Sequence, residues 1–239
     1  MGFFDKKVCS VCGGDAGRIF TKKLEDGVLC KECTGKLSPW FSDRRSSTVE
    51  QIKEQLAYRE ANKAEVAAFE PTHTFGTGTK IYIDADARKF LVTGASNWKN
   101  ANPDVVDLTK VTGVNFEARE SKVEDTFTNS EGETCSYNPP RYFISFNYYV
   151  TIMVNHPYFD DMTVKLNGSD VDGHDHQGQE QFQRMGAEIK EALTQARNDA
   201  RESVAAANAP VAPTVCPACG ATTTPVNGCC EYCGSAVSR

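Results

Sequence analysis

The chain has 239 residues, of which 40% are hydrophobic, 10% are aromatic and 24% are charged, and its formal net charge is −6. It is too apolar and too aromatic for a wholly disordered chain, and glycine and proline are too few for a fibrous one. No run of about eighteen apolar residues is present, and Met1–Lys7 has no apolar core of the kind found in secretory signals. We therefore expect one or two globular domains accompanied by small modules that something other than a hydrophobic core stabilises.

The cysteines are the clearest feature of the sequence, because eight of the ten fall into four Cys-x-x-Cys pairs. Two pairs are separated by 17 residues near the start of the chain, and two are separated by ten near its end. This spacing is typical of tetrahedral zinc sites with four thiolate ligands. The predicted ligands are Cys9, Cys12, Cys30 and Cys33 in the first site and Cys216, Cys219, Cys230 and Cys233 in the second. We expect two Zn²⁺ ions per chain, both structural, because four thiolates leave no open coordination position.

Three other uses of these cysteines fit the sequence less well. Disulfides require an oxidising compartment, whereas the absence of an export signal indicates the cytoplasm. A redox-active Cys-x-x-Cys pair normally occurs singly at the start of a helix, whereas this sequence has two sets of two pairs. Iron in place of zinc is chemically allowed by knuckles such as Cys216-Pro-Ala-Cys219. Cys229 and Cys230 are adjacent, and Cys230 preserves the Cys-x-x-Cys-Gly pattern, so Cys229 is expected to be spare. Cys135 is expected to be a second spare thiol, in a polar loop.

Residues 1–45 are predicted to form the first zinc module. Asp26-Gly27 is a strong turn signal between short strands expected over 18–21 and 27–29. A short helix is expected over 30–37, and it would carry the second pair of ligands. A knuckle, a hairpin and a helix in this order are typical of treble-clef or related zinc-ribbon folds. The aromatic residues expected to supply its small core are Phe3, Phe4, Trp40 and Phe41.

Residues 46–70 are predicted to form a helix that connects this module to the rest of the chain. Ser47 or Thr48 can act as its N-cap, and helix-forming residues dominate the segment that follows. Charged residues, among them Arg59, interrupt the apolar stripe. We therefore expect a narrow apolar face and a largely solvated helix.

The hydrophobic period changes to two within residues 75–170, which predicts β-strands. The first two strands, Lys80–Asp84 and Lys89–Thr93, are expected to form a hairpin. Further strands are expected over 105–108, 114–118, 142–154 and 162–166.

The strand predicted over 142–154 alternates along its full length. Its even-numbered residues, from Tyr142 to Val154, are expected to share one face, with the other face mixed, as in an antiparallel sheet. Phe143, Tyr149 and Met153 on the mixed face are either a contact surface or lie beneath the terminal helix. Burial in the core is the stronger expectation, because most aromatic residues in strands are buried.

A long amphipathic helix is predicted over 177–206, with an apolar stripe that includes Phe182, Met185, Ile189 and Leu193. Strands followed by one helix indicate an α+β fold. We expect an antiparallel sheet or partly open barrel, capped by this helix, over residues 75–206. An Ala/Pro linker, 207–214, is then expected to tether a second zinc module, a ribbon over 215–239.

Two motifs carry a family resemblance: Cys-x-x-Cys-Gly-Gly from Cys9, and Leu-x-Asp-Gly-x-Leu-Cys-x-x-Cys from Leu24. A helix and a Tyr-Ile-Asp-x-Asp-x-Arg-Lys-Phe hairpin from Tyr82 follow them. In these features the chain resembles a family of uncharacterised bacterial proteins with an N-terminal four-cysteine zinc domain. The segment 75–205 resembles bacterial pleckstrin-homology-like domains, and the last module resembles a widespread zinc ribbon. The resemblance implies an architecture and zinc binding, and it brings no activity with it.

The sequence contains no catalytic constellation, so we expect a protein that is not an enzyme. No nucleophile motif and no phosphate-binding or dinucleotide-binding glycine loop accompanies the four histidines, His73, His156, His174 and His176. The segment Asp170–His176 invites comparison with calcium loops, but its glycine comes too early for an EF-hand. A solvated loop before the next helix is the stronger interpretation, and a third metal site there is the alternative.

The charge distribution argues against nucleic acid and anionic membranes as partners. Residues 1–45 hold nine basic and six acidic residues, and a zinc ion with four thiolates brings this module close to neutrality. Residues 75–170 hold nine basic and thirteen acidic residues, a balance that repels phosphate groups. We therefore expect a binding or assembly protein that contacts a protein partner or another copy of itself. A nucleic-acid or membrane-surface adaptor is the alternative.

Overall fold

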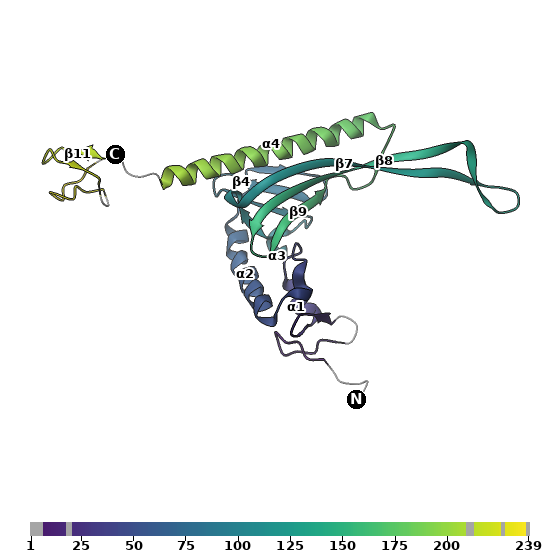
Figure 1. The fold of residues 1–239 in the computed structure, drawn as a ribbon, viewed down its shortest axis with the longest axis horizontal. Coiled ribbons are helices and arrows are strands. Elements are labelled where there is room, and N and C mark those ends of the chain that lie inside the picture. Colours follow the sequence, from purple (N-terminus) through teal and green to yellow (C-terminus); the bar gives the residue numbers. More distant parts are fainter. Residues whose placement is uncertain (1–6, 18–20, 209–212, 226–227, 238–239) are drawn as a thin grey trace. The chain divides into compact units, whose positions relative to one another are not determined.

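The computed structural model describes residues 7–17, 21–208, 213–225 and 228–237. The chain divides into two compact units, residues 1–198 and 199–239 (Figure 1). The predicted α+β class is confirmed: the sheets are antiparallel, a long helix follows them, and each unit contains one cluster of four cysteines. The strands form open sheets, and no barrel closes within the described ranges.

The first module has the predicted order of knuckle, hairpin and helix. Strands β1 (Lys22–Lys23) and β2 (Val28–Leu29) pair, and they are followed by α1 (Lys31–Lys36) and the short 3-10 helix η1 (Asp43–Ser46). The predicted core residues Phe3 and Phe4, and the strand expected to begin at Arg18, fall outside the described residues. The buried core of the module consists of Cys9, Ala16, Leu24, Leu29, Cys30, Cys33, Leu37 and Ile52, with Phe41 packed against it.

Helix α2 spans Val49–Ala68 and begins at an N-cap, Thr48, as one of the two predicted alternatives. The Thr48 hydroxyl accepts a hydrogen bond from the backbone of Gln51, whose side chain accepts one from the Thr48 backbone, and the two form a capping box. Most residues of α2 are exposed, as expected of a largely solvated helix, but the expectation that Arg59 interrupts the buried stripe is wrong. The buried residues recur at helical spacing, and their middle members are polar: Ile52, Gln55, Arg59, Asn62 and Val66.

The first sheet has the order β3-β4-β5-β6, with every pair antiparallel. Its strands are β3 (His73–Phe75), β4 (Lys80–Asp84), β5 (Lys89–Thr93) and β6 (Val105–Asp107). The predicted hairpin is confirmed, because Lys80 pairs with Thr93 and Asp84 with Lys89. Three consecutive residues of β5, Phe90 to Val92, are buried, so both faces of this strand are covered. The short helix α3 (Trp98–Ala101) packs the Trp98 ring against Phe69 and Tyr82.

The second sheet is built around one long strand. A 3-10 turn, η2 (Leu108–Lys110), leads into β7 (Val111–Thr128), which pairs with β8 (Thr134–His156). On its other edge β8 pairs with β9 (Phe159–Lys165) and then with β10 (Val171–Asp172). The strands predicted over 114–118 and 142–154 lie within β7 and β8, and the strand predicted over 162–166 matches β9 except for its last residue. Cys135, expected in a loop, lies in β8.

Helix α4 spans His176–Ala207, and its part within the first unit, residues 176–198, covers one face of this sheet (Figure 1). The Phe182 ring stacks on Tyr148 at 5.6 Å, and Tyr148 stacks on Phe116 at 6.2 Å. Gly186 lies against Phe116 so closely that an added Cβ would be 2.2 Å from the ring. Ile189 and Leu193 are completely buried, as the apolar stripe predicts.

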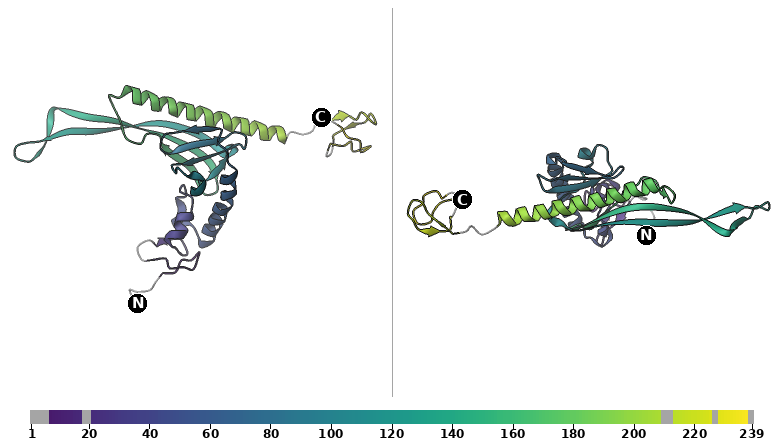
Figure 2. Two further views of the ribbon diagram at one scale, coloured as in Figure 1. Left: turned by 180° about the vertical axis from the view of Figure 1, so that it is seen from behind. Right: turned by 90° about the horizontal axis from the view of Figure 1, so that it is seen from above.

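The terminal helix covers the even-numbered face of β8, and the expectation that Phe143, Tyr149 and Met153 lie in the core is wrong. Phe143 is 63% exposed, Met153 is 41% exposed, and Tyr149 is half-buried beneath the Arg119 guanidinium. The even face is itself buried only from Tyr148 onward, because the β7–β8 ribbon runs past the ends of β9 and β10 (Figures 1 and 2). We call this outer part of the ribbon, residues 122–144, the arm.

The second unit contains a small cysteine-rich module. Strand β11 (Thr214–Val215) pairs with β12 (Thr222–Thr223), and a core of Cys216, Cys230 and Val237 is buried. The middle of the Ala/Pro linker, residues 209–212, falls outside the described residues. None of the helices in the described part of the chain combines the length and apolarity that a membrane span requires.

Candidate metal centres

Three of the four Cys-x-x-Cys pairs adopt the same knuckle. In each, the glycine after the second cysteine has a positive φ: Gly13 at 72°, Gly220 at 73° and Gly234 at 71°. Each of these glycines donates its backbone N–H to the carbonyl of the first cysteine at 2.8–2.9 Å. The left-handed conformation reverses the chain behind the two thiols, and glycine adopts it without steric conflict with a Cβ.

The fourth pair, Cys30 and Cys33, is held by a helix instead. Cys30 is the N-cap of α1, and its sulfur accepts a hydrogen bond from the Cys33 backbone N–H at 3.4 Å. The backbone continues into the helix, with Thr34 donating to the Cys30 carbonyl at 3.0 Å. This pair therefore needs no glycine directly after Cys33, which explains the later position of Gly35. The helix N-terminus places partial positive charge beside both thiols.

The first centre consists of Cys9, Cys12, Cys30 and Cys33, whose sulfur atoms all lie within 4.8 Å of one another. Cys9 and Cys12 come from the knuckle, and the short β1–β2 hairpin returns the chain to the start of α1. The Cys12 and Cys30 sulfurs are 3.8 Å apart. Three of the four thiols are buried and Cys12 is exposed.

The second centre consists of Cys216, Cys219, Cys230 and Cys233, which meet the same 4.8 Å criterion. It joins two knuckles across the β11–β12 hairpin. The sulfurs of Cys216 and Cys233 are 3.6 Å apart, and those of Cys219 and Cys230 are 3.8 Å apart.

The sulfur positions fit a tetrahedral zinc ion. Zn–S bonds of about 2.3 Å in a regular tetrahedron require S–S edges of about 3.8 Å. The three S–S separations of 3.6, 3.8 and 3.8 Å agree with that value, and all ten cysteines are free rather than joined in disulfides. Each cluster is thus positioned to bind one metal ion, consistent with two zinc ions per chain. A zinc ion with four thiolates has no position left for water or substrate.

Hydrogen bonds prepare individual thiols for deprotonation. Burial opposes ionisation of Cys9, but the backbone N–H groups of Cys12, Cys30 and Val11 outweigh it and bring its pKa down to about 6. In the second centre, the side chain and backbone of Ser235 lower the pKa of Cys233 to about 6. Zinc binds the thiolate form, so these groups favour the ligand state at Cys9 and Cys233, whereas burial raises the pKa of Cys33.

The remaining candidate residues stay outside both centres. Cys229 is exposed and its backbone pairs with Ala236, whereas its neighbour Cys230 is buried within the cluster. Cys135 pairs with Phe127 across the arm. The two cysteine clusters are the only groups of three or more ligand atoms that converge within the described ranges, and the Asp170–His176 loop contributes none.

The Asp170–His176 segment is not simply a solvated loop, because it contains strand β10 and the first residue of α4, and it supports the entry into that helix. The Asp172 carboxylate accepts a hydrogen bond from the His174 backbone at 2.7 Å, and the Asp175 carboxylate accepts one from the Gly178 backbone at 2.9 Å. The Asp175 side chain thus satisfies a first-turn N–H group of α4 and stabilises the start of the helix. His73, His174 and His176 are exposed, and no group of three ligand atoms in the described residues includes a histidine.

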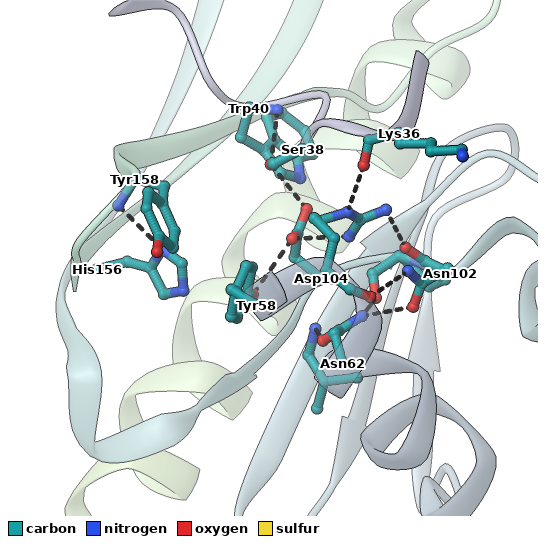
Figure 3. Close-up of polar contacts among 12 residues, drawn as sticks. Lys36, Ser38, Trp40, Tyr58, Asn62, Asn102, Asp104, His156 and Tyr158 are labelled. Atoms are coloured by element: carbon teal, nitrogen blue, oxygen red, sulfur yellow. Dashed lines mark hydrogen bonds and ion pairs between the residues drawn. The ribbon is translucent and has the colours of Figure 1, made fainter. Parts of the chain in front are cut away.

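A buried polar network joins the first metal module to the first sheet (Figure 3). At its centre the Asp104 carboxylate accepts from Arg59 at 2.8 Å, from the Ser38 hydroxyl at 2.8 Å and from the Tyr58 hydroxyl at 3.2 Å. Arg59 also donates through Nε to the Lys36 carbonyl, the last residue of α1, at 3.3 Å. The network therefore runs from the helix that carries Cys33 through α2 to the residue before β6.

Asn62 completes the network one turn further along α2. Its amide donates to the Pro103 carbonyl at 2.7 Å and accepts from the Val105 backbone at 3.0 Å. Sequence analysis missed this network, since Arg59 was expected to interrupt an apolar stripe. The sequence does contain a signal for this burial. Gln55, Arg59 and Asn62 occur at the same helical spacing as the apolar residues Ile52 and Val66, which places all five on one face of α2.

The first module is similar to a known protein family. A family described as a domain of unknown function (DUF4428) matches residues 7–55, a segment that contains all four thiols of the first centre and the start of α2. No curated protein and no solved structure matches the chain. The N-terminal four-cysteine module thus has relatives in other proteins.

Proposed function

We propose that this chain is a non-catalytic zinc-binding protein that acts through contacts with a protein partner or with a second copy of itself. The observation that carries the proposal is the arm, which presents apolar side chains where no other strand or helix of the described residues covers them. The two metal centres support the proposal as rigid modules that need no large hydrophobic core.

The arm exposes large apolar side chains on both of its faces. Val123 and Phe143 lie directly opposite each other across the ribbon and are 60% and 63% exposed. Tyr142 and Ile144, on the other face, are 45% and 37% exposed. A two-stranded ribbon is marginally stable alone in water, and an added strand or partner surface stabilises it. A partner that packs against the arm would therefore stabilise it.

The charge of the arm disfavours nucleic acid and anionic lipid. Residues 122–144 contain two basic and four acidic residues, a net charge of −2. Both cations lie over tyrosine rings of the arm: Lys122 is 4.0 Å from the Tyr142 ring and Arg141 is 4.4 Å from the Tyr137 ring. The arm therefore has no row of basic side chains of the kind that binds along a phosphate backbone.

Two closed metal centres support a role without catalysis. All four predicted ligand positions of each ion are sulfur atoms of this chain, so neither ion would be open to substrate. We extend the proposal to the bacterial cytoplasm, because ten free cysteines suit a reducing compartment. The pleckstrin-homology-like assignment is likewise a proposal, supported by two antiparallel sheets followed by one covering helix.

The test removes the apolar surface of the arm. In the double variant Val123→Ser, Phe143→Ser, we expect loss of self-association in light scattering, or loss of the proteins that crosslink to the wild type. The control is Val204→Ser, Val215→Ser, which alters exposed apolar residues of the second unit that are not part of the arm. Unchanged association in the arm variant would contradict the proposal. Saturable binding of DNA or anionic vesicles at physiological salt would favour the adaptor alternative instead.

A further inference from the structure

A cleft of about 490 Å³ lies between the first module, helix α2 and the turn that joins β8 to β9. The module contributes the segment from Trp40 to Ser47, α2 contributes Gln51 and Glu54, and the turn contributes residues 156–161. These three segments are brought together only by the tertiary fold. The volume falls within the range of small-molecule sites.

Aromatic rings form one wall of the cleft. The His156 ring lies 4.0 Å from Phe159 and 5.7 Å from Tyr158, measured between ring centroids. Tyr58 supports this group from behind, 5.1 Å from His156 and 5.2 Å from Tyr158 (Figure 3). Trp40 lines the cleft from the zinc module. Such contacts hold the rings in place before any ligand arrives.

The charged lining is entirely acidic. Four carboxylates line the cleft, and no lysine or arginine does; they belong to Asp43, Glu54, Asp160 and Asp161. None of these four is ion-paired to a cation of the described ranges. Burial raises the pKa of Tyr158, and the charge of Glu54 raises it further.

The arrangement favours an organic cation over a metal ion held by several protein ligands. Only the two cysteine clusters bring three or more ligand atoms within 4.8 Å in the described part of the chain, so the cleft carboxylates do not form a multidentate metal site. Aromatic faces attract ammonium and guanidinium groups, and carboxylates strengthen the attraction through charge-assisted hydrogen bonds. We infer that this cleft binds an organic cation that carries an ammonium or guanidinium group.

Such a cation has two sources, a free polyamine or the side chain of a lysine or arginine in another protein. The inference does not depend on the arm, because the cleft and the arm share no residues. Trp40 provides the reporter: the chain has two tryptophans, and a Trp98→Phe background leaves Trp40 alone. The zinc-loaded full chain in this background is titrated with spermidine and, separately, with a lysine-containing peptide.

We expect a saturable change in Trp40 emission that weakens with added salt. In the variant Glu54→Gln, Asp160→Asn, the half-saturating concentration should rise by about tenfold, because two of the four carboxylates are neutralised. The control Glu191→Gln, Glu202→Gln makes the same change of charge at exposed positions of α4 and should bind as the parent does. Thermal unfolding of each variant verifies that it is folded.

The two titrations also identify the source. Saturation by spermidine alone supports a free polyamine, and saturation by the peptide supports a protein side chain. The inference is overturned if neither ligand saturates, if magnesium chloride at equal ionic strength produces the same response, or if the carboxylate variant binds like the control.

Discussion

Arg59 and Asp104 form an ion pair in the interior, with 2.8 Å between Nη1 and Oδ1 and side chains that are 9% and 0% exposed. Asp104 receives two further hydrogen bonds, from Ser38 and Tyr58, so the carboxylate is fully compensated. Burial of two charges is costly, and the pair is tolerated because its geometry and its additional partners offset the loss of hydration. Its main consequence is a specific connection between α2 and the first sheet.

Removal of one partner should be strongly destabilising. We expect Asp104→Asn to lower the free energy of unfolding by about 3–5 kcal/mol, because the Arg59 charge would remain buried without its counterion. The exposed pair of Lys63 and Glu60 provides the control, and Lys63→Ala should change stability by less than about 1 kcal/mol. Urea unfolding measures both. Equal losses of unfolding free energy in the two variants would show that the buried ion pair contributes no more to stability than the exposed one.

Zinc stoichiometry should follow the two cysteine clusters independently. Cys9→Ser and Cys219→Ser should each reduce bound zinc from two ions to one, since each removes one ligand of a separate cluster. Cys229→Ser and Cys135→Ser should leave both ions bound, because neither sulfur belongs to a cluster. Metal analysis by mass spectrometry checks all four variants. Loss of zinc from Cys229→Ser would show that Cys229 is a ligand of the second centre.

The interior face of α4 should be intolerant of charge. Ile189 is completely buried, and Ile189→Asp should unfold the first unit, because a desolvated carboxylate without a partner costs several kcal/mol. Gln183→Asp, at an exposed position on the same helix, is the matched control and should remain folded. Circular dichroism during thermal unfolding distinguishes them. A folded Ile189→Asp protein that has lost a binding partner would mean that the stripe is a contact face.

The second metal module should be dispensable for folding of the rest. A chain that ends at Ala207, the last residue of α4, should retain a cooperative thermal transition, because the Ala/Pro segment that follows suits a tether with few contacts across it. Calorimetry measures the transition, and metal analysis should find one zinc ion in the shortened chain. Aggregation, or a broad transition without a heat-capacity peak, would place the boundary elsewhere.

Acidification should destabilise the protein through His156. Burial, opposed by the charge of Asp104 and assisted by Lys110, lowers the pKa of His156 from its ordinary value of 6.5. The unfolded chain then binds the proton more readily than the folded one, so the stabilising contribution is present above pH 6.5 and is lost as the pH falls below it.

The variant His156→Phe keeps an aromatic ring at this position and removes the titrating group. It should show a smaller loss of unfolding free energy than the wild type on acidification through this range. His174→Gln, which changes an exposed histidine, should retain the wild-type dependence. Parallel curves for His156→Phe and the wild type would assign the effect to other groups.

Features defined by neighbouring residues were predictable from the sequence. The spacing of the eight paired cysteines indicated which sulfurs converge, because a Cys-x-x-Cys knuckle is a local structure whose geometry depends on a few consecutive residues. The hairpin of Lys80–Asp84 with Lys89–Thr93, the N-cap at Thr48 and the stripe of Ile189 and Leu193 are local in the same sense. Periodicity and capping report the chemistry of one element at a time.

Features that depend on which other parts of the fold pack against a helix or strand were revealed only by the tertiary structure. Alternation showed that Tyr142 and Tyr148 share a face of β8, but the first is exposed and the second buried, because the neighbouring strands and α4 stop between them. Arg59 is buried because the fold brings Asp104, 45 residues away, to its guanidinium. The cleft joins three distant segments in the same way. Burial and charge pairing are properties of the packed chain, so the sequence alone determined the metal ligands and the local elements, whereas the fold decided how far β7 and β8 extend and which surfaces remain available for binding.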